Sequence, residues 1–329
     1  MLINTTTELR NYLPASVTLE FDDIKPKIRL AERETIIPIF SQAVYDLINV
    51  ESVPSGELTE LHELCAEAVA HLALLHYLDF GQVHLNSSGI QIASTDNMKT
   101  AFEWQIDQLK EQCSLQGWSA IESALKFLET AEATNLKAAW EDSDTFAANA
   151  KLLLPTLKTF ETYAHLGHSR VLFNKLSPMI LALQEDIIEP ALGTALLTVV
   201  FTPTANPSAE RTAALAQVKK LASKALAYFT IGSGFQDTML ILSDNGPLII
   251  NGMQSRLAKA KQTAPEELVM AIAQSYQNRA QGALAELLEY CQKHVSVLPE
   301  YEDSENFISD EDQTNHIPRN DPDWGMVFF

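Results

Sequence analysis

The chain has 329 residues, of which 46% are hydrophobic and 20% charged, so it is long enough for about two domains with apolar cores. This composition excludes a disordered chain, a collagen-like repeat and a disulfide-rich scaffold. With 23 basic and 43 acidic residues the formal net charge is −20, which disfavours tight binding to DNA, to RNA or to an anionic membrane surface.

The first residues lack the features of an export signal. The start, MLINTTTELR, has neither a basic region nor an apolar region, and no run in the chain reaches the roughly 20 apolar residues of a membrane helix. Cys65, Cys113 and Cys291 are far apart and form no Cys-x-x-Cys pair, so we expect buried thiols. We therefore expect a soluble protein, made in the cytoplasm, without a membrane partner.

An internal repeat organises the sequence. FDDIKPKIRLAERETIIPIF, from Phe21, aligns without a gap with FNKLSPMILALQEDIIEPAL, from Phe173, at a shift of 152 positions. Pro26 meets Pro178 in this alignment, and the same shift continues into the next segment. The sequence therefore predicts a duplicated domain.

The elements of each copy are predicted in the same order. The apolar spacing predicts a first helix with a proline in its first turn. The second proline, Pro38 or Pro190, is expected to end that helix and to open another. A polar loop and a long helix follow, at about residues 58–79 and 209–230, and residues 135–166 are expected to link the copies mainly as helix.

A short β-hairpin is predicted after each long helix, at about residues 83–93 and 238–251. The turns contain Asn86 and Gly89 in the first copy and the Asn245-Gly246 pair in the second. Because an isolated hairpin is marginally stable in water, we expect these four residues to contact a neighbouring subunit.

The last residues differ in composition from the rest. From Pro299 they contain nine acids and a single base, so we expect an extended tail that orders on a partner, or else a solvated acidic terminus. The expected partner-binding residues are its apolar side chains: Phe307, Trp324, Val327, Phe328 and Phe329. The predicted fold class is mainly α, with two tandem homologous helical domains (residues 1–142 and 143–295), each with a small β-hairpin, and an extended acidic tail (residues 296–329).

No enzyme signature occurs. The chain has no phosphate-binding loop, dinucleotide fingerprint or His-Glu-x-x-His motif. A helical cluster containing His62, Glu67 and His71 could hold a metal, but Lys219 and Ser223 replace Glu67 and His71 in the second copy, and a solvated helix face explains the cluster. His165 and His168 are expected to be surface residues of a turn, although they could bind a metal or phosphate. We therefore expect no catalytic residue, no cofactor, no metal and no enzymatic activity.

The repeated unit resembles a known group. DDIKPKIRLAERETIIPIFSQAVYDLI, then LTELHELCAEAVAHLALLHYL and the hairpin GIQI, resembles an uncharacterised family encoded in tailed phages and prophages. Its helix–turn–long-helix unit is similar to that of phage head–tail connector (adaptor) proteins, small helical domains that form a ring beneath the portal. The resemblance covers about residues 1–295, and the duplication departs from the single-domain connector.

The resemblance implies a structural protein of the virion neck. Its expected partners are other copies of the chain in a ring (a dodecamer in the family), the portal protein, tail or stopper proteins, and genomic DNA that passes without specific contacts. A negatively charged ring would repel passing DNA, which suits a conduit. The alternatives are an all-helical scaffold or interaction protein without a virion role and, last, a metalloenzyme that uses His62, Glu67 and His71.

Overall fold

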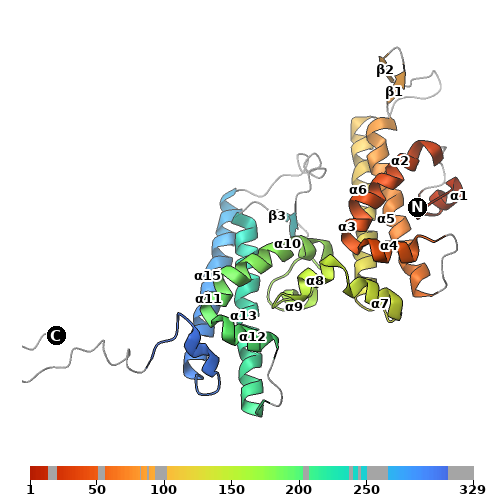
Figure 1. Ribbon diagram of the computed structural model, residues 1–329. Coiled ribbons are helices and arrows are strands. Elements are labelled where there is room, and N and C mark those ends of the chain that lie inside the picture. Colours follow the sequence, from red (N-terminus) through yellow and green to blue (C-terminus); the bar gives the residue numbers. More distant parts are fainter. Residues whose placement is uncertain are drawn as a thin grey trace, which may run out of the picture.

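The computed structural model describes residues 1–13, 21–50, 56–81, 83–86, 89–92, 102–202, 207–236, 240–243, 246–249 and 266–309. It contains two helical bodies connected through short helices (Figure 1). The first copy contains α1 (Thr6–Tyr12), α2 (Phe21–Ala31), η1 (Glu32–Ile36), α3 (Ile37–Phe40), α4 (Gln42–Ile48), α5 (Glu57–Gly81), β1 (Val83–Asn86), β2 (Gly89–Ile92), α6 (Glu103–Leu128), α7 (Thr134–Glu141) and α8 (Asp144–Ala150). The second copy contains α9 (Leu157–Glu161), α10 (Arg170–Leu183), η2 (Gln184–Ile188), α11 (Glu189–Leu192), α12 (Thr194–Phe201), α13 (Ala209–Gln236), β3 (Leu240–Ser243), β4 (Gly246–Ile249), α15 (Glu266–Lys293) and η3 (Pro299–Asp303).

The tandem arrangement predicted from the repeat is confirmed by this order. Segments η1 and η2, both π-helical, and the starts of the long helices α5 and α13 are each separated by the predicted shift of 152 residues. Each copy has its own hydrophobic core, formed in the first by residues from Leu2 to Trp140 and in the second by residues from Leu152 to Tyr301. The long pairs α5/α6 and α13/α15 form the centre of each body (Figure 1). The proposed boundary between residues 142 and 143 stays a prediction.

The helix break lies later than predicted. In both copies the chain continues through the second proline, because a five-residue π segment widens the helix immediately before it. Pro38 and Pro190 lie in the first turn after that segment, where a missing N–H is tolerated. The chain turns instead at Ser41 and Gly193, whose φ angles of 80° and 79° are incompatible with a right-handed helix.

A buried polar side chain fastens each π segment to the start of its copy. The backbone N–H of Leu2 donates to Glu32 Oε1 at 2.6 Å, and that of Leu153 donates to Gln184 Oε1 at 2.7 Å. Glu32 and Gln184 are both almost completely buried. Each N–H therefore receives an acceptor away from water, and the two copies use equivalent positions for the same contact.

The predicted fold class requires a correction in its β content. Among the described side chains both cores are formed by helices and their connections, so the bodies are all-helical. The only strands described are four residues long and form two antiparallel ribbons, β1 with β2 and β3 with β4. Figure 1 shows the first ribbon beyond the far end of α5 and α6. A two-stranded ribbon of this kind is at best marginally stable by itself in water.

The predicted extended tail is also wrong for residues 296–309. Leu298 and Tyr301 are fully buried in the second core, and η3 packs against α12. The reason is that this segment is the second copy of residues around α7, which packs against α4 in the same way. The rest of the predicted tail, residues 310–329, lies outside the described residues, as do its anchors Trp324, Val327, Phe328 and Phe329.

The burial of the three cysteines and the absence of a membrane-spanning helix were also predicted from the sequence. Cys65, Cys113 and Cys291 are free and buried, as expected. Burial raises the pKa of the Cys65 and Cys291 thiols to about 12, so they stay protonated and unreactive near neutral pH. Within the described part of the chain, every helix is too short or too polar to span a bilayer.

Candidate functional site

The two copies are joined by a carboxylate of the first and a helix start of the second. Glu122, on α6, accepts the backbone N–H of Arg170 at 2.7 Å and that of Val171 at 3.2 Å. These N–H groups belong to the first turn of α10, where a helix has no acceptors of its own. The negative charge also lies at the positive end of the helix dipole. Glu122 thus caps the second copy from the first.

The side chain of Arg170 completes this joint. Its guanidinium lies 3.3 Å from Glu122, on α6, and 2.6 Å from Glu129, the residue that follows α6, and only 19% of the side chain is exposed. Burial disfavours the charge of Arg170, but the hydrogen bonds and charges of Glu129 and Glu122 outweigh that effect and raise its pKa. The ammonium of Lys175 also lies 5.2 Å from the ring centre of Trp118, across the same boundary. The joint is therefore a network of charges shielded from water.

A cavity of about 350 Å³ lies beside the joint, between α3, α8 and α10. Its polar edge is an amide network in which Asn149 donates to Asn174 at 2.9 Å and accepts from Ser177 at 2.5 Å. Pro38 and Pro178 contribute apolar walls. These bonds join α8 of the first copy to α10 of the second, so the cavity is part of the contact between the copies.

The segment 299–309 is fastened to the second copy by several contacts. Arg211, on α13, donates to Glu300 and, at 3.0 Å, to the carbonyl of Val297. Ser304 donates to the carbonyl of Ala191 at 2.9 Å. Phe307 packs on the second core, with its ring 6.2 Å from that of Tyr301. Phe307, predicted as an anchor for another chain, therefore contacts its own domain.

The sequence held a signal for this segment that the 152-residue shift missed. Residues 140–146 read WEDSDTF and residues 301–307 read YEDSENF, at a shift of 161 positions. The contact between Trp140 and Phe146, with ring centres 6.3 Å apart, matches the contact between Tyr301 and Phe307. Insertions around the hairpin raise the shift to 157 residues at the ribbons and to 163 residues at the starts of α6 and α15, so an alignment without gaps could not find the pair.

Exposed apolar side chains occur on the corresponding helix of the two copies. They lie at the start or in the first half of the helix that follows each ribbon, α6 or α15, and are between 44% and 68% exposed. They are Phe102, Trp104, Leu109 and Leu115 in the first copy and Leu268 and Met270 in the second. Large exposed apolar side chains gathered on one element indicate a protein contact. Trp104 and Leu115 lie on one side of α6, which we call the α6 face, whereas Leu268 and Met270, two residues apart, project from different sides of α15.

The candidate metal cluster of the first copy does not assemble among the described residues. His62 Nδ1 lies 2.9 Å from the carbonyl of Ile48, so this ring serves a contact between α4 and α5. His71 is buried, and desolvation lowers its pKa although Glu67 opposes the shift. Glu67 and His71 line one polar pocket with Tyr12. His62, Glu67 and His71 are not grouped as metal ligands among the described residues.

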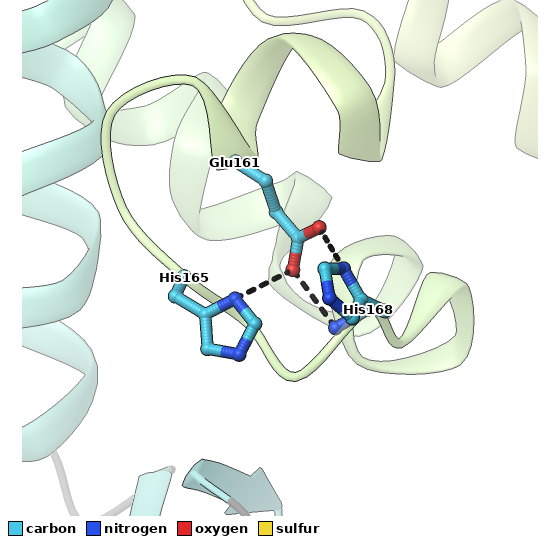
Figure 2. A group of neighbouring side chains, drawn as sticks. All are labelled: Glu161, His165 and His168. Atoms are coloured by element: carbon cyan, nitrogen blue, oxygen red, sulfur yellow. Dashed lines mark hydrogen bonds and ion pairs between the residues drawn. The ribbon is translucent and has the colours of Figure 1, made fainter.

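The second histidine pair does come together. Glu161, at the end of α9, lies between His165 and His168 (Figure 2). His168 Nδ1 is 2.6 Å from Glu161 Oε2, and His165 Nδ1 is 3.4 Å from Glu161 Oε1. Both histidines were candidates from the sequence, whereas Glu161 was not predicted to join them.

The hairpin residues are described in part. Asn86 pairs with Gly89 at the closed end of the first ribbon, and Ser243 pairs with Gly246 at that of the second. Asn245 lies outside the described residues. The predicted contact of these residues with a neighbouring subunit stays a prediction, because it requires a second chain.

Two segments of the chain, residues 36–150 and 188–311, match DUF6712, which is described as a family of unknown function. The chain belongs to this family. The two matches begin 152 residues apart, and the second includes η3 and the segment that follows it, in agreement with the packing of residues 299–309. No curated protein and no solved structure matches the chain.

Proposed function

We propose that the protein is a structural assembly subunit of the head–tail connector (adaptor) class, which forms a ring between the portal and the tail of a phage and lets DNA pass. The observation that carries the assembly part of this proposal is the set of exposed apolar side chains on the helix after each ribbon, with Trp104 and Leu115 on one side of α6. Both copies therefore offer apolar side chains to a neighbouring subunit, at different positions along the helix. The assignment to the connector class rests in addition on the resemblance of the helical unit to that of connector proteins.

The joint between the copies supports the role of a rigid subunit. Glu122, Arg170 and Glu129 hold the copies together through partly buried charge-assisted hydrogen bonds, which are shorter and stronger than neutral ones. The position equivalent to Glu122 in α15 is Ala285, and the position equivalent to Arg170 before α2 is Thr18. Neither the carboxylate nor the guanidinium of the joint is therefore present at the equivalent position of the other copy. We infer that chains associate through the exposed apolar side chains of α6 and α15, and not through a second contact of the same kind as the joint.

The charge of the chain fits the passage of DNA. The net charge of −20 per subunit would surround a channel with negative charge and would repel the phosphate backbone. Like-charge repulsion keeps passing DNA from sticking. This part of the proposal depends on ring formation, so imaging tests it first.

Negative-stain electron microscopy of the purified full-length chain, alone and mixed with the portal protein of the same genome, tests the proposal. We expect rings in the images of both samples, and in the mixed sample we expect these rings to be attached to the portal. Rings without portal binding would contradict the connector assignment and would favour a scaffold without a virion role. A chain that stays monomeric in both samples would contradict the proposal as a whole.

A further inference from the structure

The loop between α9 and α10 brings three metal-binding side chains together in the second copy. The ligand atoms of Glu161, His165 and His168 all lie within 4.8 Å of one another. Figure 2 shows the carboxylate of Glu161 between the two imidazole rings. We propose that these three residues bind a divalent transition-metal ion of the zinc class, independently of the proposed assembly role.

The distances are close to those that a metal ion requires. Two ligands at about 2.0–2.1 Å from a tetrahedral zinc ion lie about 3.3 Å from each other. His165 Nδ1 and Glu161 Oε1 are 3.4 Å apart, which already fits. His168 Nδ1 is 2.6 Å from Glu161 Oε2, the distance of a hydrogen bond, so this ring must move outward by less than about 1 Å.

The surroundings of the two histidines leave room for that movement. The side chain of His168 is 79% exposed and that of His165 is 60% exposed, so solvent surrounds most of each ring and an ion has an open path. The ring centres are 4.8 Å apart with the planes nearly perpendicular. Two imidazoles and one carboxylate would leave a fourth position for water.

The carboxylate is held in place before any ion arrives. Glu161 Oε1 accepts the backbone N–H of Leu166 at 3.1 Å and that of His168 at 2.8 Å. The loop can fold back in this way because Gly167 and His168 adopt left-handed φ angles of 67° and 59°. For a histidine this conformation is uncommon. These backbone contacts orient the ligand as outer-shell hydrogen bonds do in known metal sites.

The donor set selects the class of ion. Two imidazole nitrogens and one carboxylate oxygen suit zinc and its neighbours cobalt, nickel and copper, whereas magnesium and calcium prefer oxygen ligands alone. The loop leads directly into Ser169 and Arg170, where the second copy is capped by Glu122. A bound ion would therefore stiffen the entry to the joint between the copies.

Calorimetric titration of zinc chloride into the untagged, chelator-treated full-length chain tests the proposal. The test variants are His165→Ala and His168→Ala, and the matched control is His62→Gln, which changes a histidine of the first copy. Because both test side chains are exposed, we expect the circular dichroism spectra of the variants to match that of the unmodified chain. Comparison with the unmodified chain separates this site from the other histidines.

We expect the unmodified chain and the control to bind one zinc ion per chain. Both test variants should lose this ion, or bind it with an affinity reduced by more than the roughly 10–100-fold that changes to outer-shell residues cost. Zinc should also raise the melting temperature of the unmodified chain more than that of the test variants. The proposal is overturned if the unmodified chain binds no zinc, or if both test variants bind it with unchanged stoichiometry and affinity.

Discussion

At the scale of single residues, the structure depends on close approaches that a sequence does not display. Gly117 lies in the middle of α6, facing α5. A Cβ atom at this position would lie 2.8 Å from Cγ of Leu72, closer than two such carbons can approach. Gly282, in α15, has no atom within 4 Å of the same hypothetical Cβ. The two helical glycines therefore have different reasons to be present.

The substitution Gly117→Ala should lower the free energy of unfolding by about 1–3 kcal/mol, because an added carbon in a packed core forces Leu72 to move. The substitution Gly282→Ala should instead raise it by about 0.4–1 kcal/mol, since alanine restricts the unfolded chain and meets free space. Urea denaturation of both variants checks the pair. A stabilising Gly117→Ala would show that α5 and α6 are less closely packed than described.

The carboxylate of Glu161 gives a second prediction at this scale. Burial would raise its pKa, but the hydrogen bonds from His168 and Leu166 outweigh burial and lower it. A carboxyl group whose pKa is lower in the folded state stabilises the fold above its unfolded pKa and loses that contribution as the pH falls through the folded value. As the pH falls below about 4.3, the unfolded pKa of a glutamate, Glu161→Gln should therefore remove part of the acid-induced loss of stability. Urea midpoints measured at a series of pH values check this, and equal pH dependence of both proteins would contradict it.

At the scale of elements, the sequence predicted some features well and others poorly, for physical reasons. The long helices α5 and α13 and the duplication followed from apolar spacing and paired prolines. The position of the helix break did not, because the π segments before Pro38 and Pro190 depend on buried contacts with the start of each copy. The group around Glu161 was missed because a left-handed histidine cannot be read from residue type.

The cap that joins the copies also depends on tertiary contacts, and it can be tested directly. Glu122→Ala removes the acceptor for the first N–H groups of α10 and one partner of Arg170. Because hydrogen bonds to charged groups contribute about 1.5–3 kcal/mol each, we expect faster amide exchange at Arg170 and Val171 and a less stable joint. Lys126→Ala, an exposed change on the same helix, is the control. Unchanged exchange at these amides in the Glu122 variant would show that the cap contributes nothing.

The acidic terminus gives a prediction that separates its folded part from its remainder. Deleting residues 310–329 should leave the melting temperature of the chain unchanged, because the described core contacts of the second copy are made by residues up to Phe307. Deleting residues 296–329 should destabilise the second copy strongly, since it removes Leu298 and Tyr301 from the core. Truncating one large aromatic core residue already costs about 3–5 kcal/mol. Thermal melts of both deletions check this, and equal melting temperatures would contradict the packing of η3.

At the scale of the whole molecule, the chain is two copies of one helical unit held at a fixed joint. Both copies leave apolar side chains exposed on the helix after the ribbon, where a packed neighbour would cover them. Trp104 and Leu115 are 11 residues apart, about three helical turns, so they lie on the same side of α6. Each could contribute about 1.5–3 kcal/mol when it is buried by a neighbouring subunit.

The measurement that tests the central claim most directly is the mass of the full-length chain in solution, compared with the double variant Trp104→Glu/Leu115→Glu and the control Gln116→Glu, an exposed position on a different side of the same helix. We predict that the unmodified chain and the control form particles of several subunits, whereas the double variant stays folded and dissociates to smaller species. Monomers for the unmodified chain at every concentration, with and without the portal protein, would contradict the account. Equal particle masses for all three proteins would show that the α6 face takes no part in assembly.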